Sequence, residues 1–150
     1  MSDFDGVSLP VLLRAARNVY SDRLRAVLAQ AGCDDIPRNG LYVLGAIARA
    51  GTPLAQIIRD LGVSKQAAGQ LLDALVLRGY LERSVDPEDR RRLTIHLTER
   101  GRHAAETAGR EVDAIRASLA GLVGEEKLQT AHEVLIALID SHSRQDEEGL

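Results

Sequence analysis

The sequence has few aromatic residues and a single cysteine. Aromatic side chains make up 3% of the 150 residues, and tryptophan is absent. Because single strands and RNA loops are usually held by base stacking on aromatic side chains, this shortage argues against that class of nucleic-acid binding. Cys33 has no second cysteine with which to form an internal disulfide. Since no signal peptide or apolar run of about 18 residues is present either, we expect a cytoplasmic protein with no membrane partner.

An excess of positive charge is also missing, because the formal net charge is −3. Global charge therefore gives no support to nucleic-acid binding, and only a local basic patch could provide it. Hydrophobic residues at 45% and charged residues at 27% are typical of a folded domain. At this length we expect one compact unit as a starting point.

Most of the chain has apolar residues at spacings of three and four, which predicts amphipathic helices. Pro10 suits the first turn of the first helix, and Gly32 ends it. Ser64 and Thr98 are expected to cap the fourth and fifth helices, with a break near Gly121 and Gly124. The predicted helices cover residues 9–31, 41–48, 54–61, 65–78, 99–122 and 128–142, with a polar, frayed tail over 144–150.

The period changes from 3.6 to 2 in residues 80–85 and 93–98, which predicts a β-hairpin with an exposed loop at 86–92. A short helix, a tight turn at Gly62 and a capped second helix form a helix-turn-helix, and the hairpin adds a wing. The predicted fold is mainly α with a small β-hairpin wing. We expect a winged helix-turn-helix domain over 36–101 and a helical dimerisation region formed by 1–35 and 102–150.

The second helix of a helix-turn-helix places its N-terminal residues against base edges in the major groove. If the apolar stripe of the fourth helix is buried, helical spacing points a polar set outward. This set comprises Lys65, Gln66, Gly69, Gln70 and Asp73. Gln can pair with adenine and Lys can reach guanine or a phosphate, so the set suits DNA recognition. The alternative is an ordinary solvated helix face.

Gly69 lies inside the predicted recognition helix, where glycine costs about 1 kcal/mol relative to alanine. Some compensating gain is therefore expected. Close approach of the helix to a phosphate or to another helix would supply it, and so would tight packing. The sequence leaves both explanations open.

The predicted wing loop contains three consecutive arginines, Arg90, Arg91 and Arg92. A guanidinium at the tip of an exposed hairpin could enter an A·T-rich minor groove. Three acidic residues nearly cancel this charge, and we expect Asp89 to fix and aim Arg91 through a bidentate pair. The alternative is a surface loop with mutually neutralising charges.

These residues support a family resemblance. The run Asp86-Pro87-Glu88-Asp89-Arg90-Arg91, followed by 93–98 and Gly101, resembles the wing signature of MarR-type regulators. Residues 61–66 and 75–80 look like the turn and recognition helix of the same family.

The resemblance implies a homodimeric repressor that binds double-stranded DNA sequence-specifically and is released by a small anionic or aromatic effector. It assigns the minor groove to Arg91 with Asp89 as its partner, and the major groove to Lys65, Gln66 and Gln70. With Ser64 as the helix cap and Arg90 beside the wing arginine, these residues make up the predicted DNA-binding site.

The terminal apolar stripes predict the homodimer independently, because they are longer than a winged domain of this size can bury alone. A two-fold dimer would hold two recognition helices about 34–36 Å apart and would require a near-palindromic operator.

No catalytic motif, metal site or cofactor site is expected. The sequence has no Gly-rich phosphate loop or nucleophile elbow, and its four histidines lack the spacing of zinc ligands. Cys33 follows the first helix, whereas peroxide sensors resembling this chain carry their thiol near its start, so a buried or idle thiol is favoured. Arg14, Arg17 and Tyr20 form either a solvated face or part of an effector pocket.

Two rival functions belong to other classes. The winged fold could serve only as a protein-interaction or dimerisation module without DNA binding, since fold alone does not fix function. The chain could also be an accessory dimerisation domain of an enzyme, although its length, without a catalytic segment, argues against this.

Overall fold

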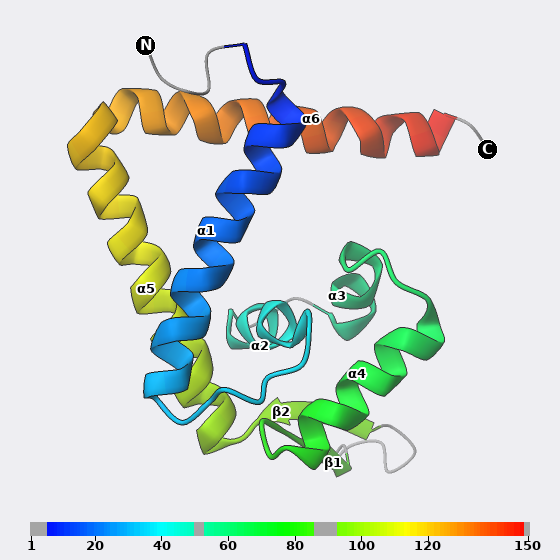
Figure 1. Cartoon of the computed structure of the whole chain (residues 1–150). Helices are drawn as coiled ribbons and strands as arrows, with labels where there is room; N and C mark the ends of the chain where they lie inside the picture. Colours follow the sequence, from blue (N-terminus) through cyan, green and yellow to red (C-terminus); the bar gives the residue numbers. More distant parts are fainter. Residues whose placement is uncertain (1–5, 50–52, 86–92, 149–150) are drawn as a thin grey trace. The chain divides into compact units, whose positions relative to one another are not determined.

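The computed structural model describes residues 6–49, 53–85 and 93–148. The chain divides into two compact units, Met1–Val112 and Asp113–Leu150. The first unit contains α1 (Leu9–Gln30), α2 (Gly40–Ala48), α3 (Leu54–Asp60), α4 (Lys65–Leu77), β1 (Leu81–Val85), β2 (Leu93–Leu97) and the start of α5 (Glu99–Val123) (Figure 1). The second contains the end of α5 and α6 (Glu125–Glu148). The predicted class, mainly helical with a small hairpin, is confirmed.

The turn between α3 and α4 has the chemistry of a helix-turn-helix. Gly62 has a φ of 63°, a left-handed conformation that glycine adopts without a steric penalty. Two residues later Ser64 caps α4, because its Oγ accepts a hydrogen bond from the Ala67 N–H at 3.1 Å. The chain therefore reverses sharply and begins the second helix where the sequence predicts it.

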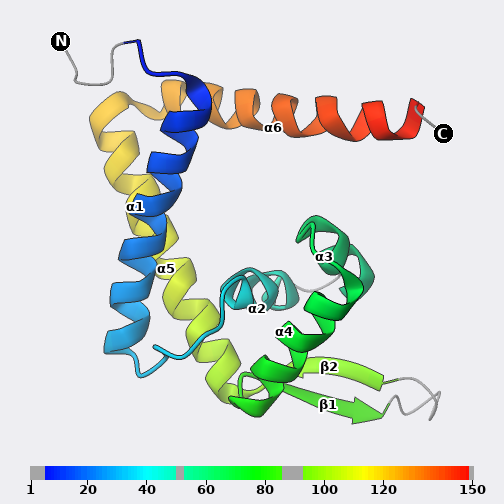
Figure 2. The same ribbon diagram turned by 45° about the vertical axis from the view of Figure 1, so that its right-hand side comes forward.

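The two strands form an antiparallel hairpin directly after α4. Leu81 pairs with Leu97 and Val85 with Leu93. The side chains of Ser84 and Thr94 are hydrogen-bonded across the strands at 2.8 Å. Figure 2 shows the hairpin beside the C-terminal end of α4. The predicted wing is thus present as a pair of strands, while its loop, 86–92, lies outside the described residues.

The core of the first unit is a single apolar cluster shared by the helices and the hairpin. On α4 the buried side chains are Ala68, Leu72 and Leu75, which confirms the inward stripe expected from the spacing. The buried members of the cluster are Leu28, Cys33, Val43, Leu44, Ala46, Ile57, Leu72, Leu75, Tyr80, Leu81, Leu97 and Ala104. Packing of this stripe fixes which face of α4 is turned to solvent.

The start of α5 is fastened to the turn after α4. Thr98 donates its backbone N–H to the Tyr80 carbonyl at 3.1 Å, and its Oγ1 accepts from the Gly101 N–H at 3.0 Å, as a cap. A Cβ on Gly101 would lie 2.0 Å from the Tyr80 carbonyl oxygen. Only glycine fits there, because the two backbones touch.

The C-terminal helices extend further than the sequence predicts. α5 passes through Gly121 without interruption, and the break occurs at Gly124, where φ is 87°. α6 continues to Glu148, so the predicted frayed tail from Arg144 onward is wrong over most of its length. Arg, Gln and Glu are good helix formers, which accounts for the extension. Within the described ranges, no helix is long and apolar enough to cross a membrane.

Candidate nucleic-acid interface

The outward face of α4 carries the predicted polar residues. Lys65, Gln66 and Gln70 are all exposed. Within the part of the chain that the structure describes, none of these three side chains takes part in a hydrogen bond or ion pair. Because no internal partner holds their donors and acceptors, they are available to a ligand that meets this face. Their predicted contacts with bases remain a prediction.

Asp73 also points outward from α4, as predicted, but it has a partner. Its carboxylate forms an ion pair with Arg83 of β1. The pair links α4 to the hairpin and neutralises an acidic group on the outward face of α4. Sequence spacing gives no signal for this contact, because it depends on how the hairpin lies against α4.

Gly69 has open space where its side chain would be. Apart from its chain neighbours and the nearby backbone of α4 itself, no described atom lies within 4 Å of the position that a Cβ would occupy. Of the two explanations that the sequence left open, tight packing within the described chain is therefore excluded. Close approach of an outside group to this face remains.

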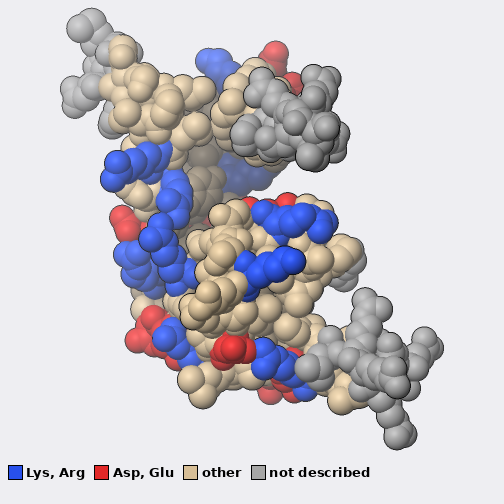
Figure 3. Space-filling model, turned by 90° about the vertical axis from the view of Figure 1, so that its right-hand side faces the viewer, with Lys and Arg blue, Asp and Glu red and all other residues tan. Residues whose placement is uncertain are grey.

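Three predicted wing residues, Asp89, Arg90 and Arg91, lie outside the described residues, so nothing is placed for them. The charges on the described surface can still be compared. Figure 3 shows Lys and Arg covering more of the face turned to the viewer than Asp and Glu. The overall negative charge of the chain is thus not distributed evenly.

The first helix of the helix-turn-helix contributes a cation that the sequence analysis did not single out. Arg59 in the last turn of α3 is exposed, and its guanidinium donates to Gln56 Oε1. Gln56 in turn donates to Asp60 Oδ1 at 2.6 Å. This short network orients Arg59, and the first helix of such a motif is the one that crosses the DNA backbone. A basic residue near the end of that helix was the signal available in the sequence.

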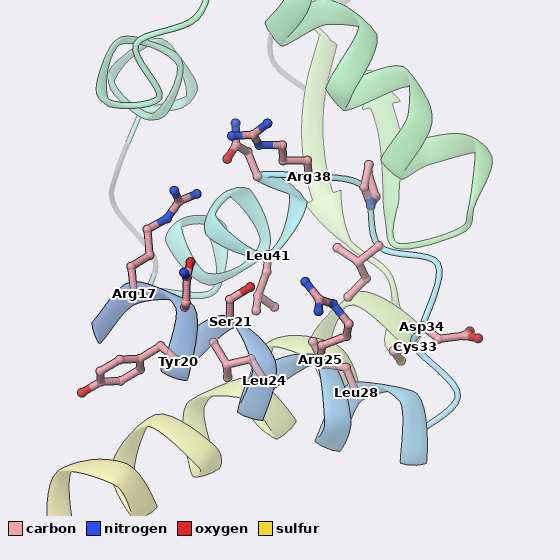
Figure 4. A pocket seen from close by; sticks show the side chains of 14 residues that line it. Arg17, Tyr20, Ser21, Leu24, Arg25, Leu28, Cys33, Asp34, Arg38 and Leu41 are labelled. Atoms are coloured by element: carbon pink, nitrogen blue, oxygen red, sulfur yellow. The ribbon is translucent and has the colours of Figure 1, made fainter. Parts of the chain in front are cut away.

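A pocket of about 650 Å³ lies between α1 and the segment that leads into α2. Arg17 and Tyr20 line it, which agrees with one of the two alternatives for these residues, whereas Arg14 does not. Figure 4 shows Arg17, Arg25 and Arg38 around the apolar side chains of Leu24 and Leu41. A cationic rim over an apolar wall suits an amphipathic anion.

The described residues that line this pocket include one acidic residue and one cysteine. Asp34 is the only Asp or Glu among the lining residues. Cys33 also lines the pocket but is only 2% exposed, and its Sγ lies 3.7 Å from the Ala31 carbonyl oxygen. This agrees with a buried thiol. Among the residues described, no group of three or more His, Cys, Asp or Glu side chains could hold a metal ion.

A polar cluster that the sequence did not reveal lies behind the pocket. Asp35 accepts hydrogen bonds on its carboxylate from the Tyr80 hydroxyl and from Arg100 Nη2, the latter at 3.0 Å. Arg78 donates to the Asp35 backbone carbonyl. The Arg100 guanidinium lies 4.3 Å from the centre of the Tyr80 ring. These residues are 65 positions apart at the extremes, so no local pattern could have indicated the cluster.

The cluster shifts the acidity of two of its members. The hydrogen bond from Tyr80 has the largest effect and lowers the pKa of Asp35. Burial opposes it, and the charges of Arg100 and Arg78 lower the pKa further. Burial raises the pKa of Tyr80, and the hydrogen bond to Asp35 raises it further. The folded state therefore favours an ionised Asp35 beside a neutral Tyr80.

Comparison with known sequences identifies the segment that contains these features. Residues 34–92 match the sequence model of the MarR family. The segment is therefore similar to this family in sequence. It spans the helix-turn-helix and the first strand of the hairpin. No curated protein sequence matches the chain.

Solved structures extend the likeness to nearly the whole chain. FabT of Streptococcus pneumoniae, solved in complex with DNA, is 23% identical with a TM-score of 0.74, covering 90% of this chain and 94% of its own. NadR, solved in complex with 4-hydroxyphenylacetate, is 24% identical with a TM-score of 0.67, covering 92% and 95%. The transcription regulator MarR of Oenococcus oeni PSU-1 is 17% identical with a TM-score of 0.67, covering 89% and 99%. At these identities the likeness shows the fold, a MarR-type winged helix.

Proposed function

We propose that this MarR-type chain is a transcription regulator that binds double-stranded DNA sequence-specifically. The observation that carries the proposal is the face of α4. Lys65, Gln66 and Gln70 are exposed in the first half of the second helix of a helix-turn-helix, and they have no partner among the described residues. That is where such motifs meet base edges, and Gln and Lys have the donors and acceptors for adenine and guanine. Asp89, Arg90 and Arg91 of the wing would add minor-groove contacts.

The working form would be a homodimer on a near-palindromic operator. Large apolar side chains on the terminal helices are exposed, which a soluble monomer seldom tolerates in such number. They include Leu9, Val11 and Val19 on α1, Leu122 and Val123 on α5, and Val134, Leu135, Ile136 and Leu138 on α6. We propose that residues 1–35 and 102–150 form the dimerisation region and 36–101 the DNA-binding domain. Sedimentation equilibrium would give twice the chain mass.

The regulator would act as a repressor that a small anionic or aromatic effector releases from DNA. Support comes from the pocket, with Arg17, Arg25 and Arg38 around apolar walls. A structural relative, NadR, has been solved with 4-hydroxyphenylacetate, an aromatic anion of this kind. Titration of the complex with that compound would lower DNA affinity if the pocket accepts it.

The decisive experiment is selection from a random double-stranded library. We expect one near-palindromic sequence to be enriched. Gln66→Ala should then lose about 1–3 kcal/mol of discrimination at one base pair of each half-site. Gln30→Ala is the matched control, because Gln30 is an exposed glutamine on a different helix, at the end of α1. An equal loss on every sequence would limit Gln66 to backbone contacts.

The same experiment distinguishes DNA binding from the rival function, a protein-interaction module. A winged helix that serves only as a protein-interaction module would enrich no sequence and would be indifferent to Gln66→Ala. In that case the proposal of DNA binding is wrong, and the exposed α4 face would have to meet a protein.

A further inference from the structure

The segment from Cys33 to Asn39 contacts two different parts of the molecule. Most of its residues, including Asp34, Ile36 and Pro37, line the pocket. Asp35, in the middle of the segment, is bonded instead to the residues that follow α4 and to α5. One short stretch of backbone therefore forms a wall of the pocket and holds the end of the recognition helix.

On the α4 side, the contacts involve both the backbone and the side chain of Asp35. Arg78, which caps α4, donates to its carbonyl, and the buried Tyr80 donates its hydroxyl to its carboxylate. Beyond this segment, at the start of α2, a Cβ on Gly40 would lie 3.1 Å from Cδ2 of Leu75 on α4. The C-terminal end of α4 is thus packed and hydrogen-bonded against the pocket segment.

Arg100 of α5 is hydrogen-bonded both to the residues after α1 and to the residue that follows α4. Its Nη2 donates to the Asp35 carboxylate at 3.0 Å and to the Gly32 carbonyl at 3.2 Å, while its Nη1 donates to the Arg78 carbonyl at 2.5 Å. Its guanidinium also lies over the Tyr80 ring. Asp35 is the one carboxylate that accepts from both Tyr80 and Arg100.

We propose that Asp35 is a positioning residue that couples occupancy of the pocket to the orientation of α4. This inference rests on the proposed function, because it gives the pocket a means of acting on DNA binding. An occupant that displaces the segment must either carry the end of α4 with it or break the bonds of Asp35. α4 is about 20 Å long at 1.5 Å per residue, so a shift at its C-terminal end tilts the end that carries Lys65 and Gln66. Coupling then arises because the pocket has different contacts in the two orientations.

A pocket-filling substitution tests the coupling without a known effector. Figure 4 shows Ser21 of α1 pointing toward Leu41 of α2 within the pocket. Ser21→Trp would place a large ring there. Ala48→Trp is the matched control, because Ala48 is exposed at the end of α2, outside the proposed dimerisation region, and does not line the pocket.

The first measurement is hydrogen exchange of the Gly79 and Tyr80 amides, which donate to the Val76 and Leu75 carbonyls at the end of α4. The second is affinity for the selected DNA duplex. With Asp35 intact, we expect Ser21→Trp to change both by about fivefold or more, the lower end of typical coupling between sites. Ala48→Trp should change neither by more than about twofold.

The same substitution is then placed in an Asp35→Ala background, where its effect on both measurements should fall below about twofold. Asp34→Ala is the matched control background, because this carboxylate lines the pocket without holding α4, and there the effect of Ser21→Trp should persist. Since Asp35→Ala could fail to fold, Tyr80→Phe is used as a milder variant. It removes the hydrogen bond from the Tyr80 hydroxyl to Asp35 and keeps the aromatic ring beneath Arg100. In that background the effect should shrink at least by half.

Equal effects of Ser21→Trp with and without Asp35 would overturn the inference, as would no effect in the otherwise unchanged chain. The two measurements also separate it from the proposed function. If no duplex is bound by any variant but the exchange of the α4 amides depends on Asp35 as expected, the coupling holds and the DNA-binding proposal fails.

Discussion

Gly69→Ala should make the protein more stable and its DNA complex weaker. In a helix interior, alanine is favoured over glycine by about 1 kcal/mol because it restricts the unfolded chain and shields the helix backbone. No atom lies within 4 Å of the new Cβ, so the folded state has no clash to offset this gain. For a chain of this length, 1 kcal/mol corresponds to about 2–4 °C in melting temperature.

The expected loss in DNA affinity comes from the same methyl group. Gly69 lies between Gln66 and Gln70 on the outward face of α4, where the backbone would approach DNA closely. An added methyl in a closely packed contact costs about 1–3 kcal/mol. This corresponds to a loss of about 5- to 150-fold in affinity for the selected duplex.

Gly109→Ala is the matched control. Gly109 is also inside a helix, α5, and also has no atom within 4 Å of its Cβ position. It should give a similar stabilisation with unchanged DNA affinity. Urea unfolding followed by circular dichroism at fixed protein concentration measures the first effect, and fluorescence anisotropy with a labelled duplex measures the second.

Two results would refute this reasoning. Destabilisation by Gly69→Ala would mean that the outer face of α4 is not open in the folded protein. Stabilisation with unchanged DNA affinity would mean that the middle of α4 does not approach DNA, and the unfavourable glycine would have no explanation.

Three further predictions concern the joint after α4, its pH dependence and the wing. Gly101→Ala should cost about 3 kcal/mol or more of unfolding free energy, since its Cβ would lie 2.0 Å from a backbone oxygen; urea unfolding equal to that of Gly109→Ala would contradict this. The pKa of Tyr80 is raised in the folded state, so stability should be full below about pH 10, the ordinary pKa of tyrosine, and fall as pH rises above it. Tyr80→Phe should flatten that alkaline fall in urea midpoints, and an unchanged slope would rule out this origin. Arg91→Ala should weaken binding to all duplexes, most with A·T-rich flanks, and reduce the salt dependence of affinity; unaltered affinity at several salt concentrations would remove Arg91 from the minor groove.

Local patterns in the sequence were sufficient for the order of helices and strands. Ser64, Gly62 and Thr98 act within a few residues of their own positions, and so their roles could be predicted. The exposed face of α4 followed from the same logic, because its apolar stripe leaves one orientation. In contrast, α5 continues through Gly121 although glycine is expected to break it. One glycine costs a helix only about 1 kcal/mol, which the rest of the helix can offset.

Contacts between distant segments could not be predicted. Asp35 resembles an ordinary loop residue, and its bonds to Tyr80 and Arg100 exist only once the hairpin and α5 are in place. The pairing of Asp73 with Arg83 likewise depends on the turn between α4 and β1. For the pocket, the arginines on α1 indicated charge, but only the fold brought Arg38 to the same rim.

The short connection between α4 and β1 has a consequence for the DNA itself. α4 ends at Leu77 and β1 begins at Leu81, with Tyr80 buried and the Asp73–Arg83 pair beside the turn. α4 and the base of the hairpin are therefore fixed relative to each other. In a functional operator, the number of base pairs between the bases met by α4 and the flank met by the wing would be constant. Inserting a single base pair there would place one of the two contacts out of reach.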